Sequence, residues 1–472
     1  MKKIVLTLIL SSSLLTLCKA QFTILHSFND TAGGNPWGNL TLLQNKFYGM
    51  AYQGGAHGQG CIFSVDTNGS GYKDLLDFNG ANGANPKGSL IISGHTMYGM
   101  TSAGGSNNEG CVFSIDTNAS RYTDLLDFNG VNGNQPWGSL TLAGNKLYGM
   151  TSAGGTRSDG NVFTIDTNGG GYKDLLDFND TNGGSPFGSL LLNGRKLYGM
   201  TYKGGIHDSG CVFSIDTNTG GGVGSYKDLY NFTNTKGYYP HGDLILSGEK
   251  LYGMTWIGGA NDNGVIFSLD TNGGNSYKDI VDFNYNTSGS QPQGSLTLSG
   301  GALYGMTFDG GVSHDGVLFS VDTNGNRFRD LFNFNNPQGD LAYGTLVFSG
   351  PKVYGMTSAG GAYSDGVIFA CDTFSSPASI NMLKAIAGNV KVYPNPSNGM
   401  FHIVCHSELS EVSQPQMKVY NALGEQVLTE TLRSTQGDNT IDLSYQPNGV
   451  YLYRVIANNG ELIGEGKLII QK

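Results

Sequence analysis

The chain has 472 residues, with 74 glycines, 11% aromatic residues and only 14% charged residues, a balance that favours short strands joined by turns over helices. Residues 1–20 hold three lysines and no acidic residue, which leaves 24 basic against 37 acidic residues and a net charge of −13 in the remainder. This charge excludes nucleic acid as an expected partner. After residue 20 no stretch approaches the roughly 18 apolar residues needed to cross a bilayer, so no membrane-spanning segment is predicted.

Residues 1–20 have the pattern of a secretory signal peptide. Lys2 and Lys3 precede an apolar run, and the small residue Ala20 stands directly before Gln21. A basic start, an apolar middle and a small residue at the end are the features of a cleaved export signal. The mature protein is therefore expected to begin near residue 21 and to act outside the cytoplasm.

A unit of about 50 residues, a period typical of propeller repeats, recurs through residues 21–373. Its most regular motif is Tyr-Gly-Met, which begins at Tyr48, Tyr98, Tyr148, Tyr198, Tyr252, Tyr304 and Tyr354. The first copy contains four apolar segments, at 38–43, 46–51, 61–66 and 72–78. Short turns such as Asp-Thr-Asn-Gly alternate with longer Gly/Asn-rich joints, so the long joints are expected to share one face. Four short strands per copy predict one blade of a β-propeller.

The two ends of the repeat region complete one another. Residues 22–28 align with the fourth segment 72–78, whereas the seventh copy stops after Thr373 without a fourth segment. We therefore predict that residues 22–28 pair with the last copy and close a seven-bladed β-propeller. Closure leaves no exposed sheet edge at the ends of the repeat region. An open solenoid is the alternative, but it does not need a strand displaced to the other terminus.

Cysteine and histidine positions are interpreted as structural or exposed. Cys61, Cys111 and Cys211 share one repeat position that is mostly valine in other copies, which predicts buried thiols without disulfides. The long joints contain three histidines, and another lies near one of them. Because different blades are far apart, we interpret them as exposed loop residues that do not share a metal ion: His57, His207, His314 and His241.

The Asp-Thr-Asn-Gly turns allow two interpretations. Asp66, Asn68, Ser70 and Asp74 have the spacing of a calcium-binding loop. Lys73 and the short hairpin favour a plain turn, in which the aspartate accepts backbone N–H groups. The sequence therefore predicts no cofactor and no metal site, with calcium at these residues as the alternative.

Aromatic residues that differ between copies are the best candidates for a binding site. A residue found in every blade serves the blade, whereas an asymmetric ligand needs blades that differ. Aromatic side chains beside Asn and Gly suit stacking on sugar rings. The alternative is that each ring packs between neighbouring blades. The predicted ligand-binding residues are Trp37, Tyr52, Trp137, Tyr202, Trp256 and Phe308.

The repeat ends at a linker, residues 374–389, and a segment of different composition follows at residues 390–472. Four patches in it, beginning at Val392, Lys418, Leu443 and Lys467, closely resemble the type A sorting domain of type IX secretion. This resemblance implies passage through the periplasm and outer membrane of a Gram-negative bacterium by the type IX secretion machinery. The residues alone predict a small β-sandwich, and a binding sandwich that stays attached is the alternative. The expected core is Val419, Ile441, Leu443, Val450, Leu452 and Ile469.

The repeat itself resembles the GloVer tandem-repeat family, in which Leu-Tyr-Gly-Met/Thr-Thr is followed by Gly-Gly and then Gly-x-Val-Phe. Here these are residues 147–155 and 160–163. The family brings no set of catalytic residues, and the standard short catalytic motifs are absent from the sequence. We therefore expect a secreted or cell-surface protein that binds a polysaccharide or surface component without chemistry of its own. The alternative is a secreted enzyme acting on a glycan or other polymer, with catalytic groups such as Glu109, Asp159, Asp315 or Asp365.

Overall fold

The computed structural model describes residues 21–217, 225–373, 390–405, 416–421, 426–432, 439–456 and 462–472. The predicted signal peptide, residues 1–20, and the predicted linker, residues 374–389, lie outside the described residues. The chain divides into a unit spanning Lys19–Ser375 and a second unit that contains Ser376–Lys472.

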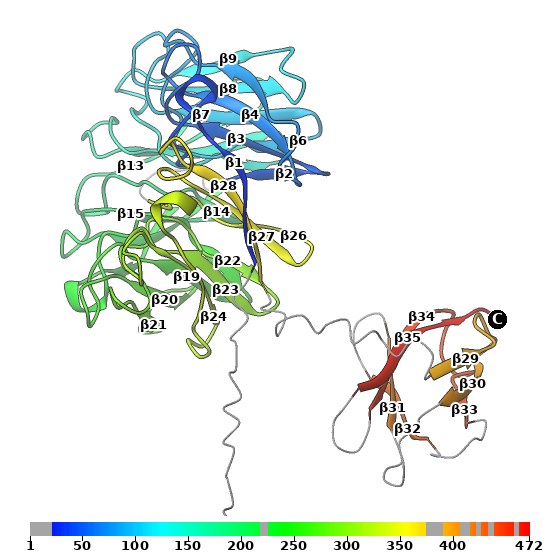
Figure 1. The fold of residues 1–472 in the computed structure, drawn as a ribbon. Helices are drawn as coiled ribbons and strands as arrows, with labels where there is room; N and C mark the ends of the chain where they lie inside the picture. The colour runs from blue at the N-terminus through cyan, green and yellow to red at the C-terminus, as the bar shows by residue number, and fades with distance from the viewer. Residues whose placement is uncertain are drawn as a thin grey trace, which may run out of the picture. The chain divides into compact units, whose positions relative to one another are not determined.

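The first unit consists of seven antiparallel four-stranded sheets, one for each sequence repeat (Figure 1). Repeats one to three are β2 (Thr41–Leu43), β3 (Lys46–Ala51), β4 (Cys61–Asp66), β5 (Lys73–Asp77); β6 (Ile91–Ser93), β7 (Thr96–Thr101), β8 (Cys111–Asp116), β9 (Thr123–Asp127); and β10 (Thr141–Ala143), β11 (Lys146–Thr151), β12 (Asn161–Asp166), β13 (Lys173–Asp177). Repeats four to six are β14 (Leu191–Asn193), β15 (Lys196–Thr201), β16 (Cys211–Asp216), β17 (Tyr226–Asn231); β18 (Ile245–Ser247), β19 (Lys250–Met254), β20 (Val265–Asp270), β21 (Lys278–Asp282); and β22 (Thr297–Ser299), β23 (Ala302–Met306), β24 (Val317–Asp322), β25 (Arg329–Asn333). Repeat seven comprises β26 (Val347–Ser349), β27 (Lys352–Thr357), β28 (Val367–Asp372) and the N-terminal strand β1 (Phe22–Ser27).

The N-terminal strand belongs to the last sheet, as the sequence predicts. β1 pairs antiparallel with β28, so that Phe22 faces Cys371 and Ser27 faces Val367. Phe28, directly after the strand, is fully buried and donates its backbone N–H to Gly366. The prediction that residues 22–28 supply the missing fourth strand is therefore confirmed.

The glycine of Tyr-Gly-Met makes room for a phenylalanine of the neighbouring strand. Gly149 on β11 stands opposite Phe163 on β12. A Cβ atom on Gly149 would lie 2.6 Å from the Phe163 ring, closer than real contacts allow. The motif therefore lets a fully buried aromatic ring lie directly against the backbone of the strand beside it.

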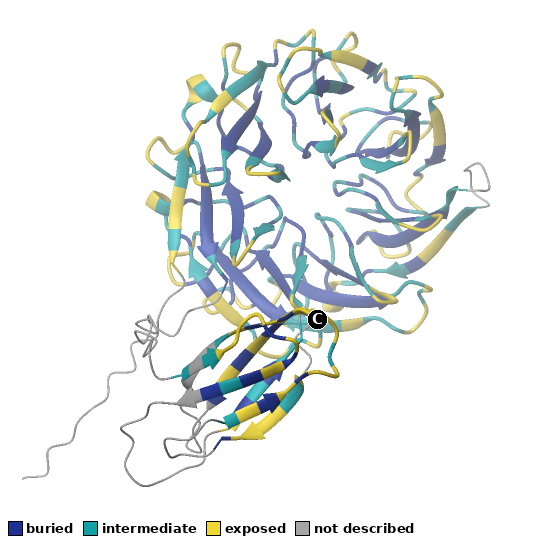
Figure 2. Cartoon of the chain, turned by 90° about the vertical axis from the view of Figure 1, so that its right-hand side faces the viewer, coloured by how far each residue is buried: buried dark blue, intermediate teal, exposed yellow. Residues whose placement is uncertain are grey.

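The hydrophobic cores lie between neighbouring sheets. One cluster combines Met100 and Phe128 of repeat two with Leu147 and Phe163 of repeat three. The same arrangement joins repeat seven to repeat one, where Phe28 and residues of β27 and β28 meet Phe47 and other residues of the first sheet. Figure 2 shows the sheets grouped around a common centre, with buried residues along the inner strands. Burial of these faces is the main stabilising contribution to the unit.

The long joints share one end of the unit, as predicted. In each repeat the joint before the first strand forms an isolated β-bridge with the joint after the second, as in Ala84 with Ala103 and Asn134 with Ala153. Three of these joints contain short 3-10 helices, η1 (Asp30–Ala32), η4 (Asn234–Lys236) and η5 (Asn336–Gln338). The first strand of each sheet is shorter than the sequence suggests. In the first repeat, residues 38–40 precede the strand and are not paired with its neighbour.

The second unit is also built of strands. β29 (Val390–Tyr393), β30 (Met400–Cys405) and β33 (Asn439–Asp442) form a three-stranded sheet. A four-stranded sheet has the order β32 (Gln426–Thr431), β31 (Gln416–Tyr420), β34 (Gly449–Ile456) and β35 (Leu462–Ile470).

The core of the second unit corrects part of the sequence prediction. Val419, Ile441 and Leu443 are buried as expected. Val450, Leu452 and Ile469 are instead among the exposed large hydrophobic residues. Strand side chains alternate between faces, so a one-residue error exchanges the two faces of a strand. The core residues of β34 and β35 are Tyr451, Tyr453, Val455, Leu468 and Ile470.

Candidate functional site: an axial pocket with an aromatic mouth

A ring of glycines brings all seven repeats together at the centre of the first unit. A Cβ atom on any of these glycines would lie between 2.2 and 2.5 Å from the carbonyl oxygen of the glycine in the next repeat. Glycine is therefore required by close backbone approach rather than by a special backbone angle. The seven are Gly38, Gly88, Gly138, Gly188, Gly242, Gly294 and Gly344, and the last of them meets Gly38.

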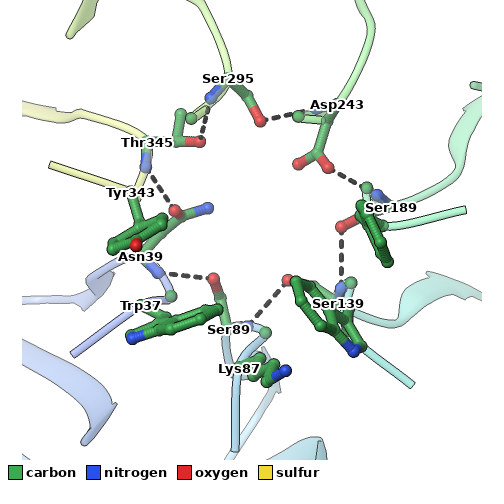
Figure 3. A pocket seen from close by; sticks show the side chains of 18 of the residues that line it. Trp37, Asn39, Lys87, Ser89, Ser139, Ser189, Asp243, Ser295, Tyr343 and Thr345 are labelled. Carbon is green, nitrogen blue, oxygen red and sulfur yellow. Dashed lines mark hydrogen bonds between the residues drawn. The ribbon is translucent and has the colours of Figure 1, made fainter. Parts of the chain in front are cut away.

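The residue after each glycine forms a cycle of hydrogen bonds (Figure 3). Each backbone N–H donates to the side-chain oxygen of the matching residue in the next repeat, at distances between 2.5 and 3.2 Å. The cycle runs through Asn39, Ser89, Ser139, Ser189, Asp243, Ser295 and Thr345, and Thr345 donates to Asn39. Any side chain with a short oxygen acceptor fits this position, which explains why Ser, Thr, Asn and Asp all occur there.

The residue before each glycine lines the mouth of a pocket on this axis. The pocket is open to solvent, and the space in it that a water molecule can reach is about 60 Å³. Its lining combines the glycines and the short polar residues after them, here called the floor, with the residues before the glycines, here called the rim. The rim residues are Trp37, Lys87, Trp137, Phe187, His241, Gln293 and Tyr343.

The aromatic rim residues contact one another across repeats. The Trp37 ring stacks on Tyr343 at 4.5 Å between ring centres and meets Trp137 at 5.7 Å. Trp137 in turn stacks on Phe187 at 4.2 Å. Phe187 lies 4.8 Å from His241. The result is an arc of rings that extends around most of the mouth.

The side chain of Lys87 lies over this arc. Its Nζ atom is 3.2 Å from the centre of the Trp137 ring, 5.0 Å from Trp37 and 5.7 Å from Tyr52. Contacts of this kind are favourable because the ring faces carry negative electrostatic potential. Burial lowers the pKa of Lys87 to about 8.

Two further ionisable groups belong to the pocket. Burial, and then the charge of Lys87, lower the pKa of His241 to about 4, so this imidazole is neutral near pH 7. Burial raises the pKa of the Asp243 carboxyl. One oxygen of Asp243 accepts the N–H of Ser189 at 2.5 Å as part of the hydrogen-bonded cycle. Asp243 thus has a structural role in the floor.

The six aromatic residues expected to bind ligand all lie at this mouth or against it. Trp37 and Trp137 line the pocket. The other four are half-buried and lie outside the rim: Tyr52 stacks on Trp37 at 4.9 Å, Phe308 meets Tyr343 at 5.1 Å, Tyr202 meets Phe187 at 4.8 Å, and Trp256 lies 6.3 Å from Tyr202. Buried indole nitrogens of Trp137 and Trp256 have no hydrogen-bond acceptor within the described residues.

Five rim residues are not among the predicted site residues: Lys87, Phe187, His241, Gln293 and Tyr343. The signal is present in the sequence, because all five occupy the same repeat position as Trp37 and Trp137 and break the repetition. His241 also corrects a prediction: it lines the pocket instead of being an exposed loop residue. The other three histidines are exposed, as expected: His57, His207 and His314.

The cysteine and turn residues are largely as predicted. Cys61, Cys111 and Cys211 are buried free thiols. In the first Asp-Thr-Asn-Gly turn, however, Asp66 pairs with Lys46 at 2.5 Å, while Asn68 accepts the N–H of Ser70 at 2.9 Å. The backbone acceptor in this turn is therefore the asparagine. In the sixth repeat Asp322 accepts the backbone N–H groups of Asn324 and Asn326 at 3.0 and 2.8 Å, as predicted.

The residues of the calcium alternative do not all lie in one turn. Asp66, Asn68 and Ser70 are joined by hydrogen bonds of the Ser70 hydroxyl at 3.2 and 2.7 Å. Asp74 lies on β5, where burial and the neighbouring Asp77 raise its pKa to about 6. The part of the chain that the structure describes contains no cluster of three or more His, Cys, Asp or Glu residues suited to a metal ion.

The carboxylates of the enzyme alternative occupy one position in four different repeats. The backbone oxygens of Glu109 and Asp365 accept hydrogen bonds from the loop of the following repeat, from Gln135 at 3.0 Å and Asn35 at 2.8 Å. Asp159 pairs with Lys203 at 3.2 Å. None of the four, which include Asp315, lines the axial pocket.

The fold and the pocket define a repeat-built all-β protein whose units meet at an axis of glycines and present a variable mouth, followed by a separate β-rich C-terminal unit. Family models match both parts. The Gloeobacter/Verrucomicrobia repeat matches residues 13–213, 129–286 and 274–401, and the chain belongs to this family. The secretion system C-terminal sorting domain matches residues 391–471.

Similarity to solved structures is found at low sequence identity, and among curated proteins none matches the chain. A fungal alcohol oxidase of the AA5 family, solved with copper, is 10% identical at a TM-score of 0.50, covering 97% of this chain and 100% of that one. PorZ, a surface component of the type IX secretion system of Porphyromonas gingivalis, is 12% identical at a TM-score of 0.48, covering 95% of this chain and 61% of PorZ.

The sorting-domain match identifies a secreted or cell-surface protein that interacts with the type IX secretion machinery. Within the described residues, no helix has the length and hydropathy needed to cross a bilayer.

Proposed function

We propose that residues 21–373 form a closed seven-bladed β-propeller that binds a polysaccharide or another surface component at the aromatic mouth of its axial pocket. The observation that carries the proposal is the arc of rings around a solvent-open pocket, because aromatic side chains offer sugars a large contact area and lose little entropy on binding.

Closure of the propeller is supported at three levels. β1 completes the last sheet, one hydrophobic cluster joins repeats seven and one, and the cycle of axial hydrogen bonds returns from Thr345 to Asn39. A closed ring fixes the seven rim residues in one order around the pocket. Such a fixed arrangement suits recognition, because little ordering is needed when the ligand binds.

Intrinsic fluorescence offers a direct test of binding. The three tryptophans of the protein, Trp37, Trp137 and Trp256, all lie at or beside the mouth. A glycan array with the purified secreted protein should identify bound polymers, and titration with each should change tryptophan emission saturably. Polymers that bind without altering this emission, or an array without any bound glycan, would contradict binding at the mouth.

Export provides a second test, of the C-terminal unit. We propose residues 374–389 as a linker and residues 390–472 as a β-sandwich recognised by the secretion machinery after a signal peptide has delivered the chain to the periplasm. Deleting residues 390–472 should leave the repeat unit folded in the periplasm, measured by cell fractionation and protease resistance. Normal appearance of the truncated protein outside the cell would count against this assignment.

A further inference from the structure

Lys87 places an unpaired positive charge at the mouth of the pocket. Its Nζ atom lies over the faces of Trp37, Tyr52 and Trp137, and none of the hydrogen bonds or ion pairs within the described residues involves it. Several other lysines of the repeats, such as Lys46 and Lys146, pair with an aspartate at 2.5 and 2.8 Å. The rings hold the ammonium group in place but leave its charge without an anion.

No neighbouring group in the pocket neutralises this charge. His241 faces Lys87 closely enough for the lysine to depress the histidine pKa, and the imidazole is neutral near pH 7. Asp243 is engaged in the floor by the N–H of Ser189, and its carboxylate does not raise the pKa of Lys87. A partly buried, unpaired ammonium group is costly and gains most from an anion supplied by a ligand.

We propose that the mouth selects acidic polysaccharides, with the carboxylate of a uronic acid unit pairing with Lys87 while adjoining sugar units contact the exposed parts of the half-buried Trp37 and Trp137. This inference rests on the proposed function and names its ligand class. The remainder of the protein is strongly acidic, so a polyanion gains little from general attraction to the surface. Binding of such a polymer therefore depends on a local cation.

Matched polymers isolate the contribution of the carboxylate. Polygalacturonate, alginate and hyaluronan are each compared with their carboxyl-reduced forms, in which every uronic carboxylate becomes an uncharged hydroxymethyl group. Binding to the purified secreted protein is followed by tryptophan fluorescence. At least one acidic polymer should bind about 10-fold or more tightly than its reduced form, as expected for a charge-assisted hydrogen bond.

Variants assign the effect to Lys87. Lys87→Gln should bind the acidic and reduced polymers equally, whereas Lys87→Arg should keep a preference for the acidic form. Lys173→Gln removes an exposed lysine from the outer strand β13 and should change nothing. Thermal unfolding of each variant verifies that the fold is intact.

The outcomes separate the two proposals. Equal binding of acidic and reduced polymers by the unmodified protein would overturn acid selection and leave polysaccharide binding in place. A preference that persists in Lys87→Gln would overturn the role of Lys87. Failure of every acidic and reduced polymer to bind would overturn this inference, whereas the glycan array tests the proposed function separately.

Discussion

Two adjacent positions in each repeat differ in how much their residues vary. The axial glycine is the same in all seven repeats, whereas the residue before it is Trp, Lys, Trp, Phe, His, Gln or Tyr. The glycine contacts the backbone of the next repeat, so any side chain there would meet a carbonyl oxygen. The preceding side chain points to the mouth, where no such contact limits its size. Repetition within this chain therefore separates positions required for assembly from positions free to serve a ligand.

Removing the N-terminal strand should have the largest effect on stability. Deleting residues 21–28 removes β1 and the fully buried Phe28, and exposes the edge of β28. Because one buried phenylalanine alone contributes about 3 to 5 kcal/mol, the loss should rival the whole stability of the unit. We expect loss of the cooperative thermal transition and self-association in size-exclusion chromatography. A monomer with an unchanged melting temperature would show that β1 is dispensable.

A single methyl group at the axis should have the next largest effect. In Gly138→Ala the Cβ atom would lie 2.2 Å from the carbonyl oxygen of Gly188, so the two repeats must move apart. We expect destabilisation of about 3 kcal/mol in denaturant unfolding. Gly144→Ala is the matched control, because Gly144 has a φ of +60° but open space around it. Its cost should be about 1 kcal/mol from backbone strain alone. Equal effects of the two variants would argue against close packing at the axis.

A change at the mouth should affect binding more than folding. Trp137→Ala removes a half-buried ring that contacts Trp37, Phe187 and Lys87. We expect polysaccharide affinity to fall about 10-fold and the free energy of unfolding to fall by less than about 2 kcal/mol. Phe128→Ala, which empties a buried position between repeats, provides the contrast of about 3 to 5 kcal/mol. Large destabilisation by Trp137→Ala without altered binding would identify the rim rings as packing between repeats.

The smallest effect concerns a difference between repeats away from the mouth. Burial and the adjacent Asp127 raise the pKa of Asp124 to about 6, whereas repeat four has Asn231 in place of the second aspartate. Because the folded state holds a proton that the unfolded state has released, stability falls as pH rises from about 4 to 6. Asp127→Asn should reduce this fall, by less than about 1 kcal/mol because both side chains are partly exposed. Denaturant unfolding across this pH range measures it, and an unchanged slope would contradict the coupling.

The sequence predicts most accurately what the repeats have in common. The pairing of residues 22–28 with the last copy follows from their alignment with six other outer strands, and the structure agrees. The exposed faces of β34 and β35 could not be inferred in the same way, since a strand that is not repeated offers no second copy to fix which alternate residues face inward. The place of His241 differs from the prediction for a related reason: burial at the axis depends on the neighbouring repeats, not on the composition of its own loop.

The axial cycle also bears on how such proteins diversify. Each repeat offers its neighbour one N–H and one oxygen acceptor, and these contacts are equivalent at every junction of the cycle. Nothing at the axis therefore encodes which repeat follows which, and the order of Trp37, Lys87 and Trp137 around the mouth is set by the covalent chain alone. Exchanging two repeats within the gene, or replacing one with a copy of another, would rearrange the recognition surface while leaving the frame unchanged. Such exchanges would therefore change ligand specificity without changing the residues that maintain the fold.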